Sequence, residues 1–148
     1  MRVLIADDNR LVASALAAMV HSFGHEVVGI AGSGLDAIHL YDQSGPDVVL
    51  MDFCMSRLNG ATACRMIVSL HPSEKIVMLS GYLSQKDMSS MECGAVARLP
   101  KPLKVEDLKR LLDEMKFPPR IEAATPPGNG KKRSIRLDRA PVSSPASS

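Results

Sequence analysis

The 148-residue sequence lacks any apolar run that approaches the ~20 residues needed to cross a bilayer, which argues against a membrane span. It also lacks a cysteine framework, because three cysteines are an odd number without a C-x-x-C pair or a histidine at metal-ligand spacing. The first six residues run directly into two aspartates, unlike a signal peptide. These absences predict a cytoplasmic protein whose cysteines are reduced thiols, most of them buried.

The sequence also has little excess of charge of either sign, since its formal net charge is only +2. The basic and acidic residues are nevertheless unevenly distributed along it. Residues 117–148 contain six basic and two acidic residues, a net charge of +4, which leaves −2 for residues 1–116. Six of the ten prolines also lie after residue 116, where few apolar residues remain to offset the entropy of ordering the chain. We therefore expect a folded domain over residues 1–116 and a disordered, basic, Pro/Ser-rich tail over 117–148. The basic residues of this tail have no aromatic residues among them, so no specific nucleic-acid binding is expected.

Short runs of almost unbroken apolar residues predict strands that are covered on both faces, as in a parallel sheet. Four clear runs lie at residues 3–6, 27–30, 48–51 and 76–79, and a weaker fifth lies at 95–99. The segments between and after them have helical spacing, at residues 11–23, 33–44, 59–70, 85–93 and 105–115.

The first of these helices has clear boundary signals. Asn9 is its expected N-cap, an apolar stripe runs from Leu11 to Phe23, and Gly24 is the expected end. Strand and helix alternate five times, which predicts an α/β fold with right-handed crossovers. We expect a doubly wound (βα)5 three-layer sandwich whose five-stranded parallel sheet has the flavodoxin-like order 2-1-3-4-5.

Polar residues follow four of the predicted strands, at the edge of a parallel sheet where ligands bind. Asp7 and Asp8 follow the first strand, Asp52 the third, Ser80 the fourth and Lys101 the fifth. Two carboxylates ~4 Å apart repel each other by roughly 4 kcal/mol at an effective dielectric constant of ~20. A divalent cation relieves this repulsion, and Mg²⁺ suits a site with few carboxylates and several waters. The pattern therefore predicts a magnesium site at this edge.

The chemistry that suits such a site is phosphoryl transfer. A carboxylate can act as a nucleophile and form an acyl phosphate. Cations around the phosphoryl oxygens assist this transfer, and the Lys101 ammonium would act beside Mg²⁺. Ser80 offers a hydroxyl donor to a phosphoryl oxygen. Each residue alone carries little information, so the prediction depends on their joint placement.

Four segments resemble the receiver domain of two-component response regulators, and the resemblance covers residues 1–116. They occur in the order and at the approximate spacing typical of that family: Asp7-Asp8, the stretch from Asp52 to Gly60, Ser80-Gly81 and Lys101-Pro102. The resemblance implies that Asp52 accepts the phosphoryl group and also binds Mg²⁺. It implies that Asp8 binds the metal directly and Asp7 largely through water, with the backbone carbonyl of Cys54 as a further ligand.

The same resemblance implies how the domain signals. Ser80 would be the switch hydroxyl, Lys101 would pair with the phosphoryl group, and the peptide bond before Pro102 would be cis. A histidine kinase or histidine phosphotransfer protein would donate the phosphoryl group. The phosphorylated domain would then bind a downstream effector protein through its fourth helix, fifth strand and fifth helix. Such a stand-alone domain is a switch rather than an enzyme, since it catalyses only its own phosphorylation and dephosphorylation.

Two positions depart from the family pattern. Ser56 stands where proline is usual, which loosens the loop after Asp52. Arg98 stands where the family usually has a tyrosine or phenylalanine that turns inward on switching. A guanidinium is not expected to be buried there, so we expect Arg98 to remain at the surface and meet an acidic group of a partner.

These departures leave a second hypothesis open, a pseudo-receiver that binds partners without phosphorylation. The retention of all five site residues counts against it. A phosphohydrolase of the haloacid-dehalogenase type would carry a second aspartate at the position of Cys54 and a cap-sized insertion, and both are missing. A flavodoxin-like FMN carrier is disfavoured because the acidic loop after the first strand would repel a phosphate without a metal.

Overall fold

The computed structural model describes residues 1–81 and 92–116. The chain divides into one unit over Met1–Leu112 and a second over Asp113–Ser148, of which only the last four residues of a helix are described. The elements are β1 (Arg2–Ala6), α1 (Arg10–Ser22), β2 (Glu26–Ala31), α2 (Gly34–Ser44), β3 (Val48–Asp52), α3 (Gly60–Leu70), β4 (Ile76–Ser80), β5 (Ala97–Pro100) and α5 (Val105–Lys116). Most of the predicted fourth helix, and all of the predicted tail, lie outside the described residues.

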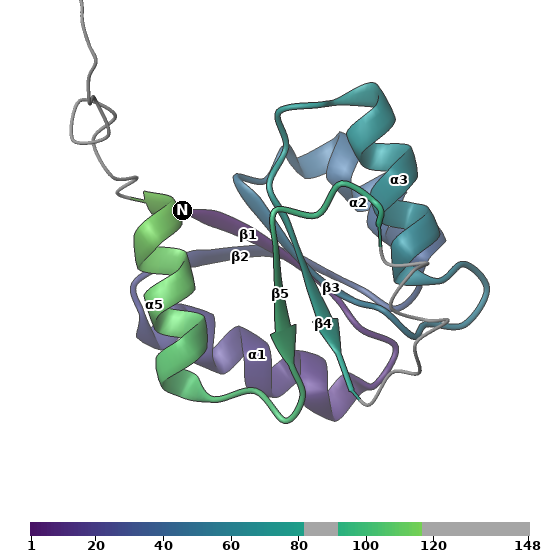
Figure 1. The fold of residues 1–148 in the computed structure, drawn as a ribbon. Helices are drawn as coiled ribbons and strands as arrows, with labels where there is room; N and C mark the ends of the chain where they lie inside the picture. The colour runs from purple at the N-terminus through teal and green to yellow at the C-terminus, as the bar shows by residue number, and fades with distance from the viewer. Residues whose placement is uncertain (82–91, 117–148) are drawn as a thin grey trace, which may run out of the picture. The chain divides into compact units, whose positions relative to one another are not determined.

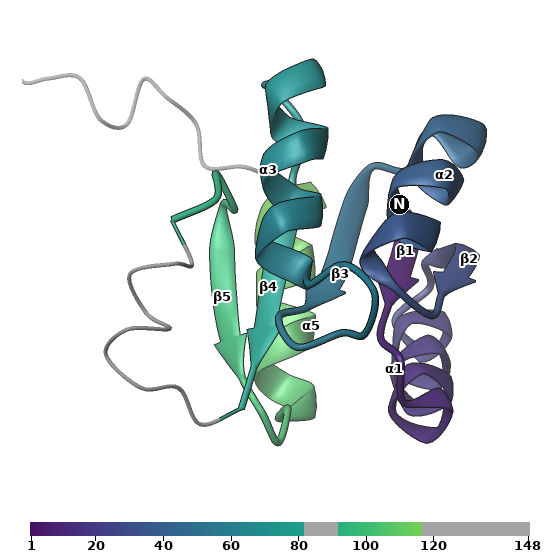
Figure 2. The same ribbon diagram turned by 90° about the vertical axis from the view of Figure 1, so that its right-hand side faces the viewer.

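The first unit is a three-layer α/β sandwich. All four strand pairs are parallel, and the sheet has the order β2-β1-β3-β4-β5. Figures 1 and 2 show α1 and α5 on one face of the sheet and α2 and α3 on the other. The predicted fold class and strand order are therefore confirmed.

Burial explains why the central strands contain apolar residues without alternation. All five residues of β3 and the last four residues of β1 are buried, because helices cover both faces of the sheet. The largest fully buried side chains come mainly from the sheet, and they include Leu4, Ile5, Leu50, Met51, Met78 and Leu79. This apolar centre fixes the positions of the polar residues that follow each strand.

Local sequence sets the helix boundaries. The Asn9 side chain accepts hydrogen bonds from the backbone N–H groups of Leu11 and Val12, as expected of an N-cap. Gly24 has φ +85°, a conformation that favours glycine, and it follows the end of α1. The predicted apolar stripe is wrong at its first position, because Leu11 lies in the first turn and is 83% exposed.

Strand register brings the predicted site residues to one edge of the sheet. Ala6 pairs with Met51, so Asp7 and Asp52 are the next residues on adjacent strands. Ser80 pairs with Pro100, so Lys101 follows directly. The carboxyl ends of β1, β3, β4 and β5 therefore meet where the crossover direction of the sheet changes.

The loop between β3 and α3 is held closely against its surroundings by two glycines. The Gly60 N–H donates to the Phe53 carbonyl over 2.9 Å, and a Cβ at Gly60 would lie 2.0 Å from the Asp52 carbonyl oxygen. The Gly34 N–H donates to the Leu58 carbonyl over 2.9 Å, and a Cβ there would lie 2.2 Å from that oxygen. Both positions therefore require a residue without a side chain.

We predict that Gly60→Ala lowers the free energy of unfolding by about 1–3 kcal/mol or more. The added methyl group would clash with the Asp52 carbonyl oxygen and force the backbone at position 60 away from it. Alanine in a helix is itself favoured over glycine by about 1 kcal/mol, so the clash must exceed this gain. Urea unfolding measures the difference. The control is Gly32→Ala, whose Cβ would meet only an Asp36 side-chain oxygen at 3.9 Å. Equal stability of the two variants would contradict the prediction.

Candidate functional site

Three carboxylates gather at the carboxyl ends of β1 and β3. One oxygen from each of Asp7, Asp8 and Asp52 lies within 4.8 Å of the other two, a spacing that could hold a metal ion. Asp7 and Asp52 are buried, with 2% and 6% of their surfaces exposed, whereas Asp8 is exposed. The sequence-based expectation that these three residues converge is thus met by the geometry.

Backbone N–H groups orient two of the carboxylates. The Asn9 N–H donates to Asp7 Oδ1 over 2.8 Å, and the Ser56 N–H donates to Asp8 Oδ2 over 3.2 Å. The Asp7 backbone is held in turn by its own N–H, which donates to the Ala31 carbonyl over 3.0 Å. These donors leave no signal in the sequence, because almost any residue type can supply a backbone N–H.

Lys101 joins the two buried carboxylates. Its Nζ lies 2.9 Å from Asp7 Oδ2 and 3.0 Å from Asp52 Oδ1. Its backbone N–H donates to the Ser80 carbonyl over 2.7 Å, and the peptide bond to Pro102 is cis, as the resemblance implied. The ammonium is therefore fixed both through the backbone and through its two ion pairs.

The electrostatics of the site follow from this burial. Burial raises the pKa of Asp52, and the charges of Asp7 and Asp8 raise it further, while Lys101 opposes both effects. Burial alone would lower the pKa of Lys101, but its bonds to Asp7 and Asp52 raise the pKa above its usual value. The cluster thus has more negative charge than the single ammonium offsets, which favours a bound cation.

The donor set fits Mg²⁺ better than a softer metal. All three side chains offer carboxylate oxygens, which are hard ligands, and no histidine or thiolate belongs to the cluster found among the described residues. The exposure of Asp8 leaves one side of the cluster open to solvent and to a substrate. The residues present are therefore suited to a cation that keeps several waters.

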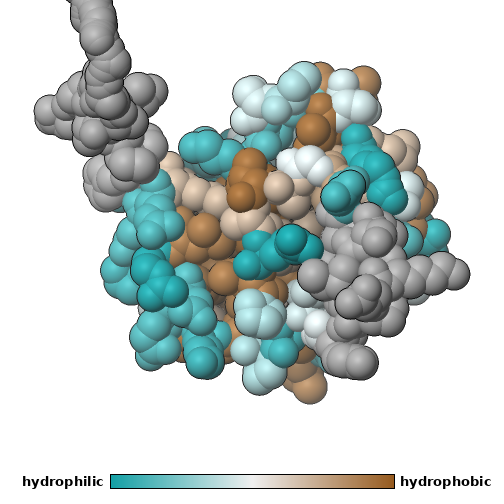
Figure 3. Space-filling model, viewed as in Figure 1, coloured by the Kyte–Doolittle hydropathy of each residue, from teal (hydrophilic) through white to brown (hydrophobic). Residues whose placement is uncertain are grey.

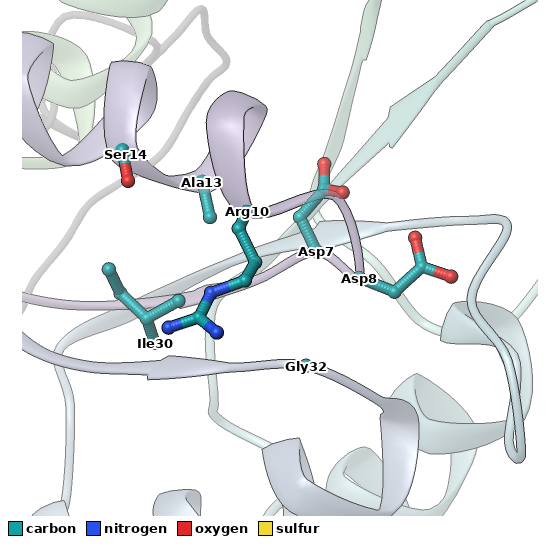
Figure 4. A pocket seen from close by; sticks show the side chains of 7 residues that line it. All are labelled: Asp7, Asp8, Arg10, Ala13, Ser14, Ile30 and Gly32. Atoms are coloured by element: carbon teal, nitrogen blue, oxygen red, sulfur yellow. The ribbon is translucent and has the colours of Figure 1, made fainter.

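The cavity beside Asp7 and Asp8, about 440 Å³, extends toward α1 and β2. Figure 4 shows that the Arg10 side chain points toward Ile30 and Gly32, away from the carboxylates of Asp7 and Asp8. Arg10 therefore leaves the cation-binding edge of these carboxylates clear. Lys101 is the basic residue that pairs with Asp7 and Asp52 in the part of the chain that the structure describes.

The remaining predicted site residues lie beside this cluster. Ser80 is half-buried at the end of β4, and among the described residues its hydroxyl donates to none of the three carboxylates. Cys54 lies two residues after Asp52 with an exposed side chain. In the same loop Arg57 has φ +69°, a left-handed conformation that costs a non-glycine residue of the order of 1–3 kcal/mol.

Arg98 is exposed on β5, where it pairs with Met78, as we expect of a guanidinium at this position. Within residues 1–81 and 92–116, every helix is too short or too polar to traverse a lipid bilayer.

Comparisons with known proteins agree with this fold. The family model of the response regulator receiver domain matches residues 3–113. The transcriptional regulatory protein PdtaR of Mycobacterium tuberculosis is 40% identical over 109 residues, which are 72% of this chain and 52% of PdtaR. The chain therefore spans about half the length of that relative. The chemotaxis protein CheY of Thermotoga maritima is 31% identical over 115 residues, which are 77% of this chain and 96% of CheY.

A solved structure gives the same result at the level of the fold. The response regulator receiver domain protein (CheY-like) from Methanospirillum hungatei superposes with a TM-score of 0.70 at 26% identity. The match covers 78% of this chain and 95% of that one.

We predict that Asp52→Asn raises the free energy of unfolding at neutral pH when Mg²⁺ is removed by a chelator. The pKa of Asp52 is raised above its usual 3.8 in the folded state, so the folded state loses stability as pH rises from there through the folded-state pKa. The variant lacks this loss, so its advantage should shrink as pH falls toward the usual pKa. Urea unfolding at several pH values measures both effects.

Mg²⁺ should reverse the order of stability. A ligand at 100 times its Kd stabilises the folded state by about 2.7 kcal/mol, which the wild-type site should gain and Asp52→Asn should largely lose. Asp42→Asn, an exposed carboxylate outside the cluster, is the matched control. An Mg²⁺ response that is the same in wild type and Asp52→Asn would rule out this cluster as the metal site.

Proposed function

The chain belongs to the response regulator receiver domain family of two-component signalling systems, and we propose that it accepts a phosphoryl group on Asp52 in an Mg²⁺-dependent reaction. The observation that supports this most strongly is the cluster of three carboxylates with the Lys101 ammonium between two of them. Such a domain is a signalling switch, and its only catalysis would be its own phosphorylation and dephosphorylation. The donor would be a histidine kinase or histidine phosphotransfer protein, and we infer that the exchange takes place in the cytoplasm.

In the proposed transfer, an ionised oxygen of Asp52 attacks the phosphorus atom. The new P–O bond forms as the P–N bond of a phosphohistidine breaks, and the imidazole nitrogen leaves with the electron pair. Asp52 is suited to this role because it ends a fully buried strand and its position is fixed by backbone packing at Gly60. The ion pair with Lys101 lowers the pKa of Asp52 against the effect of burial, and so favours the ionised form that would attack.

The lysine and the serine would then act on the phosphoryl oxygens. The Lys101 ammonium is 3.0 Å from Asp52 Oδ1, so a short movement would bring it to an oxygen of the attached phosphoryl group. Ser80 ends the strand beside Asp52, and rotation or displacement would let its hydroxyl donate to a second oxygen. A shift of Ser80 and Lys101 together would move the carboxyl end of β5, since Lys101 N–H is bonded to the Ser80 carbonyl.

Mg²⁺ would be held by Asp8, Asp52 and the backbone carbonyl of Cys54, with Asp7 acting largely through water. When bound, the metal supplies positive charge beside the phosphoryl oxygens. The protein's own contribution is to hold the three carboxylates close together and to fix Asp7 and Asp8 through the Asn9 and Ser56 N–H groups.

The output of the switch would be a changed affinity for a downstream effector protein. Its expected surface contains the predicted fourth helix, which lies outside the described residues, together with β5 and α5. In the view of Figure 3, hydrophobic surface lies between β5 and the hydrophilic outer surface of α5. Arg98 on β5 and Val96 just before the strand are both exposed, and we propose that Arg98 meets an acidic group of the effector there.

A pseudo-receiver that binds partners without phosphorylation is the second candidate function. The exposed Arg98 supports it, because the guanidinium occupies the position of the aromatic residue that usually follows the switch hydroxyl inward. Under this alternative the carboxylate cluster would bind a cation without accepting a phosphoryl group.

We predict that the purified chain gains one phosphoryl group from a small-molecule phosphodonor in the presence of Mg²⁺, as read from its intact mass. The gain should be lost when a chelator removes Mg²⁺, because repulsion between the carboxylates and the donor is then not offset. It should also be lost in Asp52→Ala and retained in the control Asp42→Asn. A folded wild-type protein that gains nothing would overturn the phosphoacceptor proposal and favour the pseudo-receiver.

A further inference from the structure

Two buried cysteines that the proposed phosphoryl site does not use lie against each other. Cys64 lies on α3 and is fully buried, and Cys93 lies in the segment that leads into β5 and is 4% exposed. Cys64 Sγ lies 3.4 Å from the Cys93 carbonyl oxygen, to which its S–H donates. Both are free thiols, although they are separated by 29 positions in the sequence.

A glycine explains why the two thiols meet. Gly94, directly after Cys93, has φ +93°, and a Cβ there would lie 2.9 Å from a Val68 methyl group. Val68 is one helical turn after Cys64 on α3. The absence of a side chain at Gly94 therefore lets the chain approach α3 closely and brings Cys93 onto Cys64.

The two sulfur atoms differ in access and in acidity. Both cysteines belong to the buried core, but Cys93 also lines a cavity of about 550 Å³ together with its neighbours up to Arg98, whereas Cys64 does not line this cavity. The hydrogen bond from the Cys64 thiol lowers the pKa of Cys93 to about 6 against the opposing effect of burial. The same bond and burial raise the pKa of Cys64. The reactive thiolate is therefore on Cys93, the sulfur nearer to solvent.

We propose that Cys64 and Cys93 form a reversible disulfide when the protein meets hydrogen peroxide, with Cys93 reacting first. The Cys93 thiolate attacks one peroxide oxygen, the O–O bond breaks, and the other oxygen leaves as hydroxide and becomes water on protonation. Cys64 then gives up its proton and attacks the Cys93 sulfur, so that the S–S bond forms, the S–O bond breaks and a second water leaves. Two thiols lose two electrons in total, and one hydrogen peroxide is reduced to two waters.

The bond would tie α3 to the segment that enters β5. That strand ends next to Lys101, so the disulfide would restrict the part of the sheet that positions the phosphoryl-site ammonium. Formation of the bond requires neither Asp52 nor a metal. Oxidation of the thiol pair is thus independent of phosphorylation, and it can be tested separately.

The test exposes the reduced full-length chain to graded hydrogen peroxide, blocks the remaining thiols under denaturing conditions, and maps the peptides by mass spectrometry. We expect a peptide pair linked through Cys64 and Cys93, with two fewer blocked thiols, and full recovery of both after treatment with a dithiol. The oxidised protein should also unfold at a higher urea concentration than the reduced protein, because the cross-link restricts the unfolded chain. Asp52→Asn should form the same linked peptide.

The exposed Cys54 serves as the internal standard. At a peroxide dose that oxidises most of Cys54, Cys64 and Cys93 should be largely oxidised too. If the thiol-blocking reagent still reacts completely with both of them at that dose, the proposal is overturned. In Cys64→Ser, which keeps a donor to the Cys93 carbonyl, Cys93 should accumulate as a sulfenic acid that a dimedone probe traps. In Cys93→Ser, Cys64 should stay reduced. Trapping at Cys64 instead of Cys93 would refute the assigned order of reaction.

Discussion

The contact of the Lys101 ammonium with both Asp7 and Asp52 is the interaction on which the site depends. Two carboxylates are buried at adjacent strand ends, and burying charge is costly unless the charge is paired. One ammonium pairs with both of them, yet burial and the neighbouring carboxylates still raise the pKa of Asp52. The site therefore retains excess negative charge toward its exposed side at Asp8. This excess negative charge favours the binding of a divalent cation.

The sheet creates this contact, because residues from four strands reach one edge only if the register is fixed. Parallel pairing of Ala6 with Met51 and of Ser80 with Pro100 sets the four strand ends side by side. The central strands are apolar on both faces, so a shift in register would bury polar groups that now lie at the strand ends. Close packing at Gly60 then fixes the backbone of Asp52 from behind. Core packing thereby determines the distances between the Lys101 ammonium and the carboxylates of Asp7 and Asp52.

Much of this arrangement could be predicted from the sequence, because unbroken apolar runs followed by acidic or basic residues indicate both the strands and their functional ends. The N-cap at Asn9 and the convergence of Asp7, Asp8 and Asp52 follow from such local patterns. Other features depend on tertiary contacts that leave no local signal. They include the exposure of Leu11, the N–H donors that orient Asp7 and Asp8, the left-handed Arg57 and the meeting of Cys64 with Cys93. The cysteine pair shows this most clearly, since the two residues are far apart in the sequence and a glycine beside one of them permits the contact.

We propose that Asp52, and neither of the other two carboxylates, becomes the acyl phosphate. Borohydride reduces an acyl phosphate to an alcohol, so treatment of the phosphorylated protein would convert the modified aspartate to homoserine, which peptide mass spectrometry locates. We expect homoserine at position 52 alone, in a reaction that needs Mg²⁺. Homoserine at position 7 or 8, or an unchanged position 52 in a protein that has gained a phosphoryl group, would contradict it.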